Sequence, residues 1–379
     1  MKSRNLSRLY ALSALFCIAS TSAHAQPSVT IYGAIDVYVA QYNSSGTGNQ
    51  TAVNSGFNPN NLGFAIREDL GGGASAGAVL EMQPVADSGS FGQGGKPFGR
   101  QSFVYLGGNW GQMSLGRIHT PGRTFGIRYS PTGWLSSDPG GNLYIAMGTG
   151  FSPAMNTDTT GARLSNAIAY TSPTIGGVSA TVMHSVNEGQ AYSTGSAKVT
   201  TGGIGWANGP INIDLVYGKI YDIPGFQVGQ TDLALGGSYN FTFLKAYASI
   251  VRRSGSVVAT AGAVTPIPGS SGADRVVAGG ISIPFGADAI GLGVARMNVS
   301  AGHSGFFPAN VSVPFATRLD NATVVSVAYT KNLSKRTQLF ASYGLLKNDP
   351  LGNASFNLGM RPTTGGQSSI VAAGLRVNF

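Results

Sequence analysis

The side chains that could do chemistry are sparse in this chain of 379 residues. After residue 25 the histidines are His119, His184 and His303, which lie singly and far apart. A nucleophile needs a base within hydrogen-bond reach, and a bound metal ion needs a cluster of ligands. This spacing indicates neither arrangement, so we expect no enzymatic activity, no metal site and no cofactor.

Charged residues make up only 10% of the chain, against about 25% in a typical soluble domain. Lys and Arg outnumber Asp and Glu by 24 to 15. The basic residues are scattered rather than clustered, so we expect no nucleic-acid partner. The effect of each charge therefore depends on the element that positions it.

Residues 1–25 have the pattern of an export signal. Lys2, Arg4 and Arg8 precede a short apolar run over 11–18, and Ala23-His24-Ala25 is a small-residue cleavage pattern. Cleavage there would remove Cys17, the only cysteine, which suits a protein exported to an oxidising compartment. We therefore divide the chain into a signal peptide (1–25) and one mature domain (26–379).

The mature domain alternates with a period of two residues, which is typical of strands with two different faces. At the end of the chain one face carries Val371, Ala373, Leu375, Val377 and Phe379. In the first predicted strand Val29, Ile31, Ile35, Val37 and Val39 alternate with Thr30, Tyr32, Asp36 and Tyr38. After residue 25 no run approaches the ~18 apolar residues of a membrane-spanning helix, so helical membrane proteins are excluded.

The predicted connections between strands alternate between short and long. Short turns are predicted near 69–73, 107–111, 172–177, 207–210, 240–242, 284–288 and 332–335. Longer Gly/Ser/Asn-rich loops are predicted near 43–58, 87–98, 120–161, 188–196, 222–230, 254–273, 298–318 and 346–365. Short turns at one end and long loops at the other are typical of transmembrane β-barrels.

The predicted fold is therefore an all-β, antiparallel, up-and-down transmembrane barrel of sixteen strands. A bilayer offers no water to backbone N–H and C=O groups, so strands in it must pair on both sides and leave no edge. The 56 glycines, about 15% of the chain, suit the turns and a tightly packed inner wall.

The longest connection, 120–161, shows neither helix nor strand periodicity, and loops of this length are usually functional. Its charged residues are Arg123, Arg128, Asp138 and Asp158. A sixteen-stranded barrel encloses an aqueous channel, and a loop folded inward would narrow it. We expect this third long loop to do so.

The mature chain resembles the trimeric general porins of Gram-negative outer membranes over its whole length. The resemblance rests on a set of short motifs in a fixed order and on the terminal Phe379. These motifs are Ser28-Val29-Thr30-Ile31-Tyr32-Gly33, Leu62-Gly63-Phe64, Glu68-Asp69-Leu70-Gly71-Gly72-Gly73, Phe98-Gly99-Arg100-Gln101-Ser102-Phe103-Val104-Tyr105-Leu106, Ser114-Leu115-Gly116-Arg117 and Ala169-Tyr170-Thr171-Ser172-Pro173.

The resemblance implies a homotrimer in the outer membrane, in contact with lipid and lipopolysaccharide. Each subunit would be a separate water-filled pore for passive diffusion of small hydrophilic solutes and ions. A substrate-specific channel is the alternative, with inner-face aromatics such as Tyr32 and Tyr38 as a track for its solute. Phe379 would be the terminal residue used in barrel assembly.

In such porins an arginine cluster on the wall faces acidic groups on the inward loop. Arg100 and Arg163 match the wall positions. Alternation places them with Ser102 and Ser165, opposite Phe103, Leu164 and Ile168. Asp138 resembles the acidic bend of the loop, and Arg123 and Arg128 would add positive charge to it.

The chain departs from the family at two positions, with Asn61 and Ala34 where many relatives have Arg and Lys. These departures thin the basic wall, and we expect a weak preference for anions. Arg117 shares parity with Met113 and Leu115 and should point outward. Because a lipid-facing Arg is costly, we expect it at a subunit contact in the trimer.

Overall fold

The computed structural model describes residues 27–146, 162–186, 198–221, 230–254, 259–260, 263–264, 273–299, 320–356 and 360–379. The predicted signal peptide, Asp158 and His303 lie outside these ranges. In the described part, no helix is both long and apolar enough to cross a membrane.

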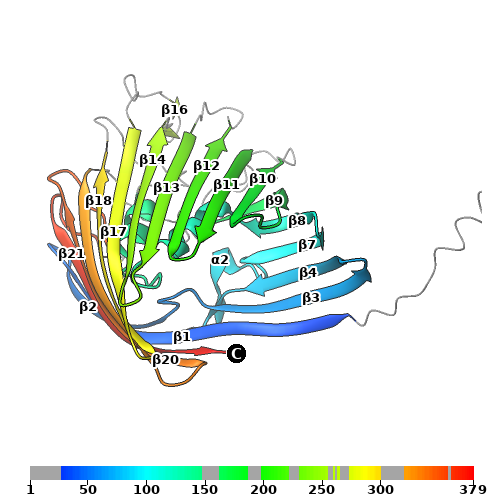
Figure 1. The fold of residues 1–379 in the computed structure, drawn as a ribbon. Coiled ribbons are helices and arrows are strands. Elements are labelled where there is room, and N and C mark those ends of the chain that lie inside the picture. The colour runs from blue at the N-terminus through cyan, green and yellow to red at the C-terminus, as the bar shows by residue number, and fades with distance from the viewer. Residues whose placement is uncertain are drawn as a thin grey trace, which may run out of the picture.

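One large antiparallel sheet forms the wall of the molecule (Figure 1). Its strands are β1 (Ser28–Ser44), β2 (Gly48–Ser55), β3 (Asn61–Gly71), β4 (Ala74–Met82), β7 (Gln101–Gly108), β8 (Gly111–His119), β9 (Arg163–Thr171), β10 (Val178–Ser185), β11 (Val199–Asn208), β12 (Ile211–Ile220), β13 (Gln230–Asn240), β14 (Lys245–Ser254), β17 (Ala273–Phe285), β18 (Asp288–Asn298), β19 (Ala322–Asn332), β20 (Thr337–Asn348) and β21 (Gln367–Asn378). Two short hairpins lie outside the wall: β5 (Pro84–Val85) with β6 (Ser90–Phe91), and β15 (Ala259–Thr260) with β16 (Ala263–Val264).

The sheet closes on itself because β1 pairs with β21, from Ala34 opposite Asn378 to Ser44 opposite Ser368. On its other edge β1 pairs with β3 along its first half and with β2 along its second half. β2 and β3 are thus one wall strand with a break in it. Counted so, the 17 strands of the sheet form a closed barrel of sixteen, as predicted.

Asp36 on β1 holds the break between β2 and β3. Its carboxylate accepts hydrogen bonds from the backbone N–H groups of Gly56, Phe57 and Asn58 at 2.7–3.0 Å. The prediction of one loop over 43–58 was wrong, because Gly48–Ser55 pairs with β1. The polar composition of β2 conceals it from a search for apolar alternation.

All seven predicted short turns join consecutive wall strands at one end of the barrel. Aromatic side chains gather at this end: Trp110 stacks on Tyr170, Phe285 stacks on Tyr329, and Tyr239 packs on Phe241. Such an aromatic girdle is typical of membrane barrels at the lipid–water interface.

The alternation predicted in the sequence separates the two faces of the wall. On β21 the outward Val371, Leu375 and Val377 are 41–51% exposed, whereas the inward Ile370 and Ala372 are buried. Polar groups such as Asp36 lie on the inward side. An apolar exterior around a polar interior suits a barrel in lipid.

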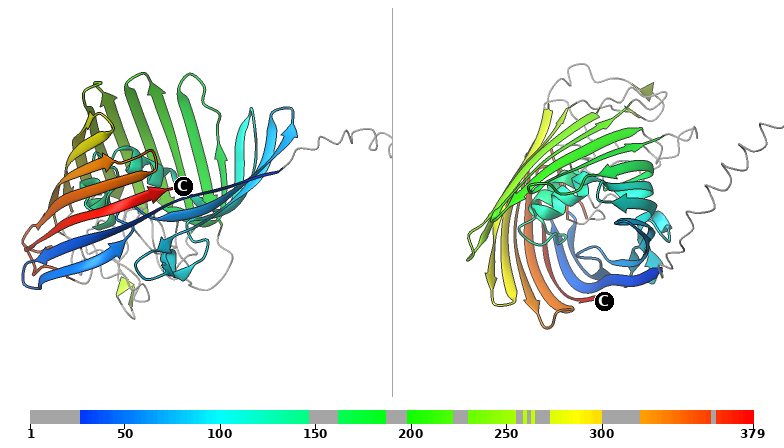
Figure 2. Two further views of the ribbon diagram at one scale, coloured as in Figure 1. Left: turned by 90° about the horizontal axis from the view of Figure 1, so that it is seen from below. Right: turned by 45° about the vertical axis from the view of Figure 1, so that its right-hand side comes forward.

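Residues 120–146 contain two helices, α3 (Pro121–Arg128) and α4 (Pro139–Ala146), where we predicted no regular structure. α3 begins with Thr120, whose side chain accepts a hydrogen bond from the Arg123 N–H, and with Pro121 in its first turn. Figure 2 shows both helices within the ring of strands. A third helix, α2 (Gly92–Gly95), is a short turn with three residues of positive φ.

Candidate functional site

The segment 120–146 contacts the inner wall at widely separated strands. Arg128 at the end of α3 pairs with Asp214 on β12, its Nη1 atom lying 2.8 Å from each carboxylate oxygen. The Tyr144 hydroxyl of α4 lies 2.9 Å from the Ser249 hydroxyl on β14. Ser137 is hydrogen-bonded to Ser342 on β20. The segment leaves β8 and reaches β12, β14 and β20, so it extends across the interior.

Asp138 organises this segment from within. Its carboxylate accepts hydrogen bonds from the Ser130 hydroxyl at 2.5 Å, the Thr132 hydroxyl at 2.8 Å and the Gly141 N–H at 2.7 Å. Asp138 is 3% exposed, and burial raises the pKa of its carboxyl despite these hydrogen bonds. The carboxylate thus joins the turn before α4 to the first turn of that helix.

Inward-facing glycines in the wall make room for the segment. A Cβ atom on Gly236 would lie 2.5 Å from the Tyr129 ring and 2.7 Å from the Phe125 ring. On Gly293 it would lie 2.9 Å from Pro131 and 3.0 Å from Pro139. A Cβ atom on Gly203 would lie 3.0 Å from Pro121, and one on Gly280 would lie 2.7 Å from Pro131. These glycines were not among the predicted site residues, although the alternation in the sequence places them on the inward face of four strands.

An arginine cluster lies at the long-loop ends of β7, β8 and β9. Arg100 Nε is 2.5 Å from Glu81 Oε1, and the Tyr32 hydroxyl donates to the other carboxylate oxygen at 2.9 Å. Arg123 interacts electrostatically with Arg100 and Glu81, and Arg163 with both of these arginines. The structure thus brings together three of the five predicted constriction residues around one acid, Glu81.

The charges of Arg123 and Arg163 are less compensated than that of Arg100. Arg100 is paired with Glu81, whereas Arg163 donates to the neutral side-chain amide oxygen of Gln93 at 3.1 Å. Burial and the neighbouring Arg100 lower the pKa of Arg123 to about 10. Arg123 is therefore still a cation at neutral pH. Arg100 and Arg163 are each 4% exposed, so their guanidinium groups can reach the channel by their electric field but not by direct contact.

The remaining two predicted constriction residues, Arg128 and Asp138, lie elsewhere on the segment. Arg128 pairs with Asp214, and Asp138 accepts hydrogen bonds from its own loop. The expected arrangement of a basic wall facing an acidic loop is reversed at one point. There the cation, Arg128, is on the loop and the acid, Asp214, is on the wall.

The faces predicted around Arg100 and Arg163 were wrong in part. Ser102 lies opposite Arg117 on the outward face, and Phe103 packs inward. Leu164 is also inward at 3% exposure, although Ile168 is outward as predicted. Asn166 has a φ of 52°, and the β8–β9 register shifts between Gly116 and Ile118. This β-bulge inverts the faces on β9 and was not visible in the sequence. On β7 the alternation begins only at Gln101, after Arg100.

Arg117 is outward in register and half-buried within its own subunit. Its Nε donates to the Gly99 carbonyl at 2.7 Å and its Nη1 to the Ser165 hydroxyl at 2.8 Å. Its predicted subunit contact remains a prediction. Phe379 exchanges two backbone hydrogen bonds with Gly33, at 2.9 and 3.0 Å, at the closing seam of the barrel.

Further inward ion pairs were not predicted. Arg376 bonds Asp36 at 3.0 Å, and Arg253 lies 3.4 Å from Asp232. Ala34 and Asn61, where the resemblance led us to expect Lys and Arg, lie opposite each other in register. Inward parity in the first and last strands could have indicated Asp36 and Arg376.

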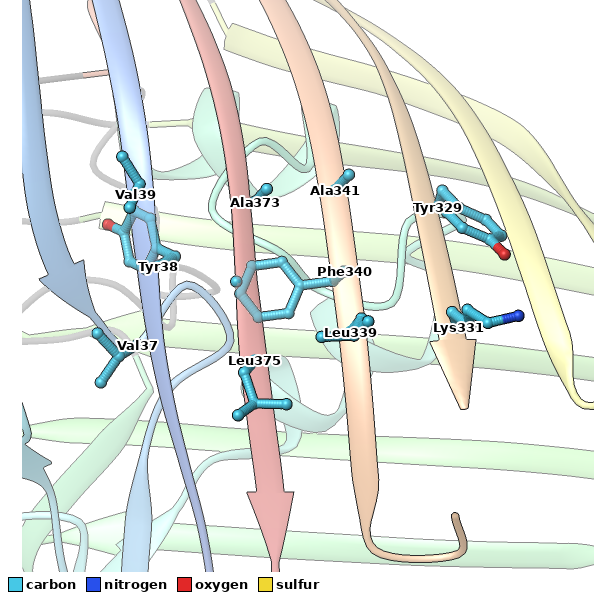
Figure 3. A pocket seen from close by; sticks show the side chains of 11 residues that line it. Val37, Tyr38, Val39, Tyr329, Lys331, Leu339, Phe340, Ala341, Ala373 and Leu375 are labelled. Carbon is cyan, nitrogen blue, oxygen red and sulfur yellow. The ribbon is translucent and has the colours of Figure 1, made fainter. Parts of the chain in front are cut away.

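The outer face has a shallow groove over β19, β20, β21 and β1 (Figure 3). Val37 and Val39 of β1 form one edge, Tyr329 and Lys331 of β19 form the other, and small residues lie between them. The lining includes Val37, Val39, Leu339, Ala341, Ala373, Gly374 and Leu375. The groove thus belongs to the membrane-facing side and not to the channel.

In the described residues, no group of three or more His, Cys, Asp or Glu side chains could hold a metal ion. A closed antiparallel barrel with an apolar exterior, an aromatic girdle and charges inside defines the class of outer-membrane channels.

The family model described as Gram-negative porin matches residues 11–351, and the chain belongs to this family. It is 28% identical over 346 residues to outer membrane porin protein 32 of Delftia acidovorans, covering 87% of each chain. It resembles the solved anion-selective porin from Comamonas acidovorans, with a TM-score of 0.72 and 25% identity over 93% of this chain and all of the other. The trimer form of OmpT of Vibrio cholerae shares the fold alone, with a TM-score of 0.63 and 13% identity over 93% and 99% of the two chains.

The protein is therefore an outer-membrane porin, a channel and not an enzyme, as predicted. The predicted barrel and outer-membrane location are confirmed by the family and by the fold.

Proposed function

We propose that this porin is a general diffusion channel for small hydrophilic solutes and ions, constricted by the segment 120–161. The contact of Arg128 with Asp214, together with those of Tyr144 and Ser137, carries the proposal. They fix the described part of the segment across the interior at three strands. A segment so fixed reduces the free cross-section of the barrel and sets a size limit for solutes.

The channel prefers anions weakly in this proposal. Arg100, Arg123 and Arg163 share the single carboxylate of Glu81, so the local charge is positive. The relative from Comamonas acidovorans, described as an anion-selective porin, supports this sign. Two other described inward arginines, Arg253 and Arg376, have acidic partners, so the preference is weak.

The two inner tyrosines considered for a specific solute track have other contacts. Tyr38 is 7% exposed and packs on Phe57, with ring centroids 4.7 Å apart. The Tyr32 hydroxyl is bonded to Glu81. Both therefore serve the wall, which favours general diffusion.

Liposome swelling with sugars of increasing size tests this proposal. A smooth fall of the swelling rate with solute size is expected, whereas saturation by one solute would indicate a specific channel. Reversal potentials in a KCl gradient should show a small anion preference, and a clear cation preference would contradict the proposed sign.

We also propose a homotrimer, whose subunits meet over the groove at the closing seam. Small side chains such as Ala341 and Ala373 allow close approach of a second wall, as small residues do between membrane segments. Arg117 is a second proposed contact. Lipid and lipopolysaccharide cover the remaining apolar exterior.

A further inference from the structure

Several wall strands carry a cation on their outward face near the long-loop end. Outward direction follows from alternation with exposed apolar residues of the same strand: Arg252 follows Ile250, and Arg275 precedes Val277. Ile250 is 39% exposed and Val277 is 45% exposed. Arg252 and Arg275 are themselves exposed.

These two arginines lie directly opposite each other, because Arg252 of β14 pairs in register with Arg275 of β17. Directly opposed residues on antiparallel strands have Cβ atoms about 4.5–5.5 Å apart, and like charges in this position repel. The two guanidinium groups therefore concentrate positive charge at one point of the outer surface.

Neither guanidinium is neutralised by the parts of the chain that the structure describes. The nearest acids in register, Asp232 and Asp274, are on the inward face beside Arg253 and are 4% and 2% exposed. The neighbouring outward cation differs in this respect, because Arg296 on β18 forms a two-pronged ion pair with Asp349, at 2.7 and 3.0 Å. The wall thus compensates Arg296 and leaves the Arg252–Arg275 pair open.

The position of the pair indicates what compensates it. The apolar band of Ile250 and Val277 meets the hydrocarbon, so the pair just beyond it lies at headgroup level on the long-loop side, which faces the exterior in barrels of this class. Guanidinium groups match phosphate geometry with two parallel hydrogen bonds, and two of them can hold one phosphate.

We propose that Arg252 and Arg275 together bind a phosphate group of lipopolysaccharide in the outer leaflet. This assignment rests on the outer-membrane location of the channel and deepens the proposed contact with lipopolysaccharide. Arg252 and Arg275 are one specific site for this contact, and they lie away from the channel interior.

The test is the thermal stability of the purified, detergent-solubilised protein during titration with diphosphorylated lipid A. The wild type should be stabilised by this lipid and much less by dephosphorylated lipid A or by inorganic phosphate at equal concentration. R252Q/R275Q should need at least about tenfold more lipid A for half of the effect, because a two-pronged contact is lost. The matched control K335Q/R336Q, which removes two exposed charges from a turn at the other end, should titrate like the wild type.

R252K/R275K keeps the charge without the planar fork, and it should need at least about threefold more lipid A. If R252Q/R275Q does not fold, R252K/R275K tests the proposal instead. If a variant that folds needs no more lipid A than the wild type for half of the effect, the proposal is overturned. Equal stabilisation by dephosphorylated lipid A or by inorganic phosphate also overturns it, as does dissociation of R252Q/R275Q into monomers without lipid, which would indicate a subunit contact.

Single-channel recording separates this proposal from the proposed function. Both variants should retain wild-type conductance, because the two side chains face away from the interior. If the wild type forms no diffusion channel, the proposed function fails while the lipid A titration still stands on its own.

Discussion

Arg128 Nη1 lies 2.8 Å from both carboxylate oxygens of Asp214, which joins helix α3 of the inner segment to strand β12 of the wall. The Asp214 side chain is 10% exposed and that of Arg128 is 41% exposed. The pair thus lies at the boundary between wall and channel, where it positions the segment without being isolated from water.

Breaking this pair should loosen the segment without unfolding the barrel. A partly exposed ion pair stabilises by up to about 1 kcal/mol, which corresponds to a roughly fivefold larger population of the detached segment in R128Q. Planar-bilayer recordings should show more current noise and more frequent steps of higher conductance. K331Q breaks a pair with Asp288 at the turn end and is the control. Equal noise in R128Q and the wild type would show that the pair does not hold the segment.

Ion selectivity should depend more on Arg123 than on Arg128. Arg128 is neutralised by Asp214, whereas Arg123 shares Glu81 with Arg100 and Arg163. R123Q should therefore shift the reversal potential in a KCl gradient toward cations more strongly than R128Q. A larger shift in R128Q would contradict this assignment.

The same comparison has a pH dependence. The pKa of Arg123 is lowered to about 10 by burial and by Arg100, so the side chain loses its charge as the pH rises through that value. The difference in selectivity between the wild type and R123Q should be constant near neutral pH and decrease toward pH 10. A difference that persists unchanged above that pH would show that Arg123 is not titrating.

Much of the wall was predictable because its alternation is imposed by two different solvents. On β21 the predicted outward face is the observed one from Val371 to Phe379. The prediction failed at β9, where the positive φ of Asn166 inverts the faces of Ser165 and Leu164. A bulge adds one residue without changing composition, so periodicity cannot reveal it.

The inner segment was predictable in its existence but not in its contacts. Its length, and the resemblance to porins, indicated that residues 120–161 are functional. Its helices depend on local caps at Thr120 and Asp138 and on packing against the wall, which short-range patterns do not contain. Asp138 was expected to act as a pore-lining acid by its resemblance. Its three hydrogen-bond donors all belong to its own loop and are visible only in the fold.

The inward glycines should be sensitive to any side chain. G236L would place atoms against Tyr129 and Phe125, so it should destabilise the packed segment by about 1–3 kcal/mol and push it toward the channel axis. Conductance should decrease and thermal unfolding should occur at a lower temperature. The adjacent G237L is the control, because a Cβ there has only the Asn212 carbonyl within 4 Å, at 3.8 Å. Equal behaviour of the two variants would contradict a packed segment over β13.

Arg117 should contribute to the proposed trimer through its position on the outward face. Its hydrogen bonds to Gly99 and Ser165 fix the guanidinium within one subunit, where it can present its remaining surface to another. R117A should lower the temperature at which trimers dissociate on semi-native gels. Unchanged heat resistance would show that this residue is not a subunit contact.

The groove at the closing seam offers a sharper test of the subunit contact. Ala373 and Ala341 are small outward residues of β21 and β20, and Gly374 lies beside them. A373W would fill the groove and keep a second wall at a distance, so trimers should dissociate at a lower temperature or fail to form. The barrel itself should remain folded, because the new ring points into the space that lipid or a neighbour occupies. A248W places the same ring on the exposed face of β14, on another part of the wall, and should leave the trimer intact. If A373W trimers are as heat-resistant as those of A248W, the subunits do not meet over this groove.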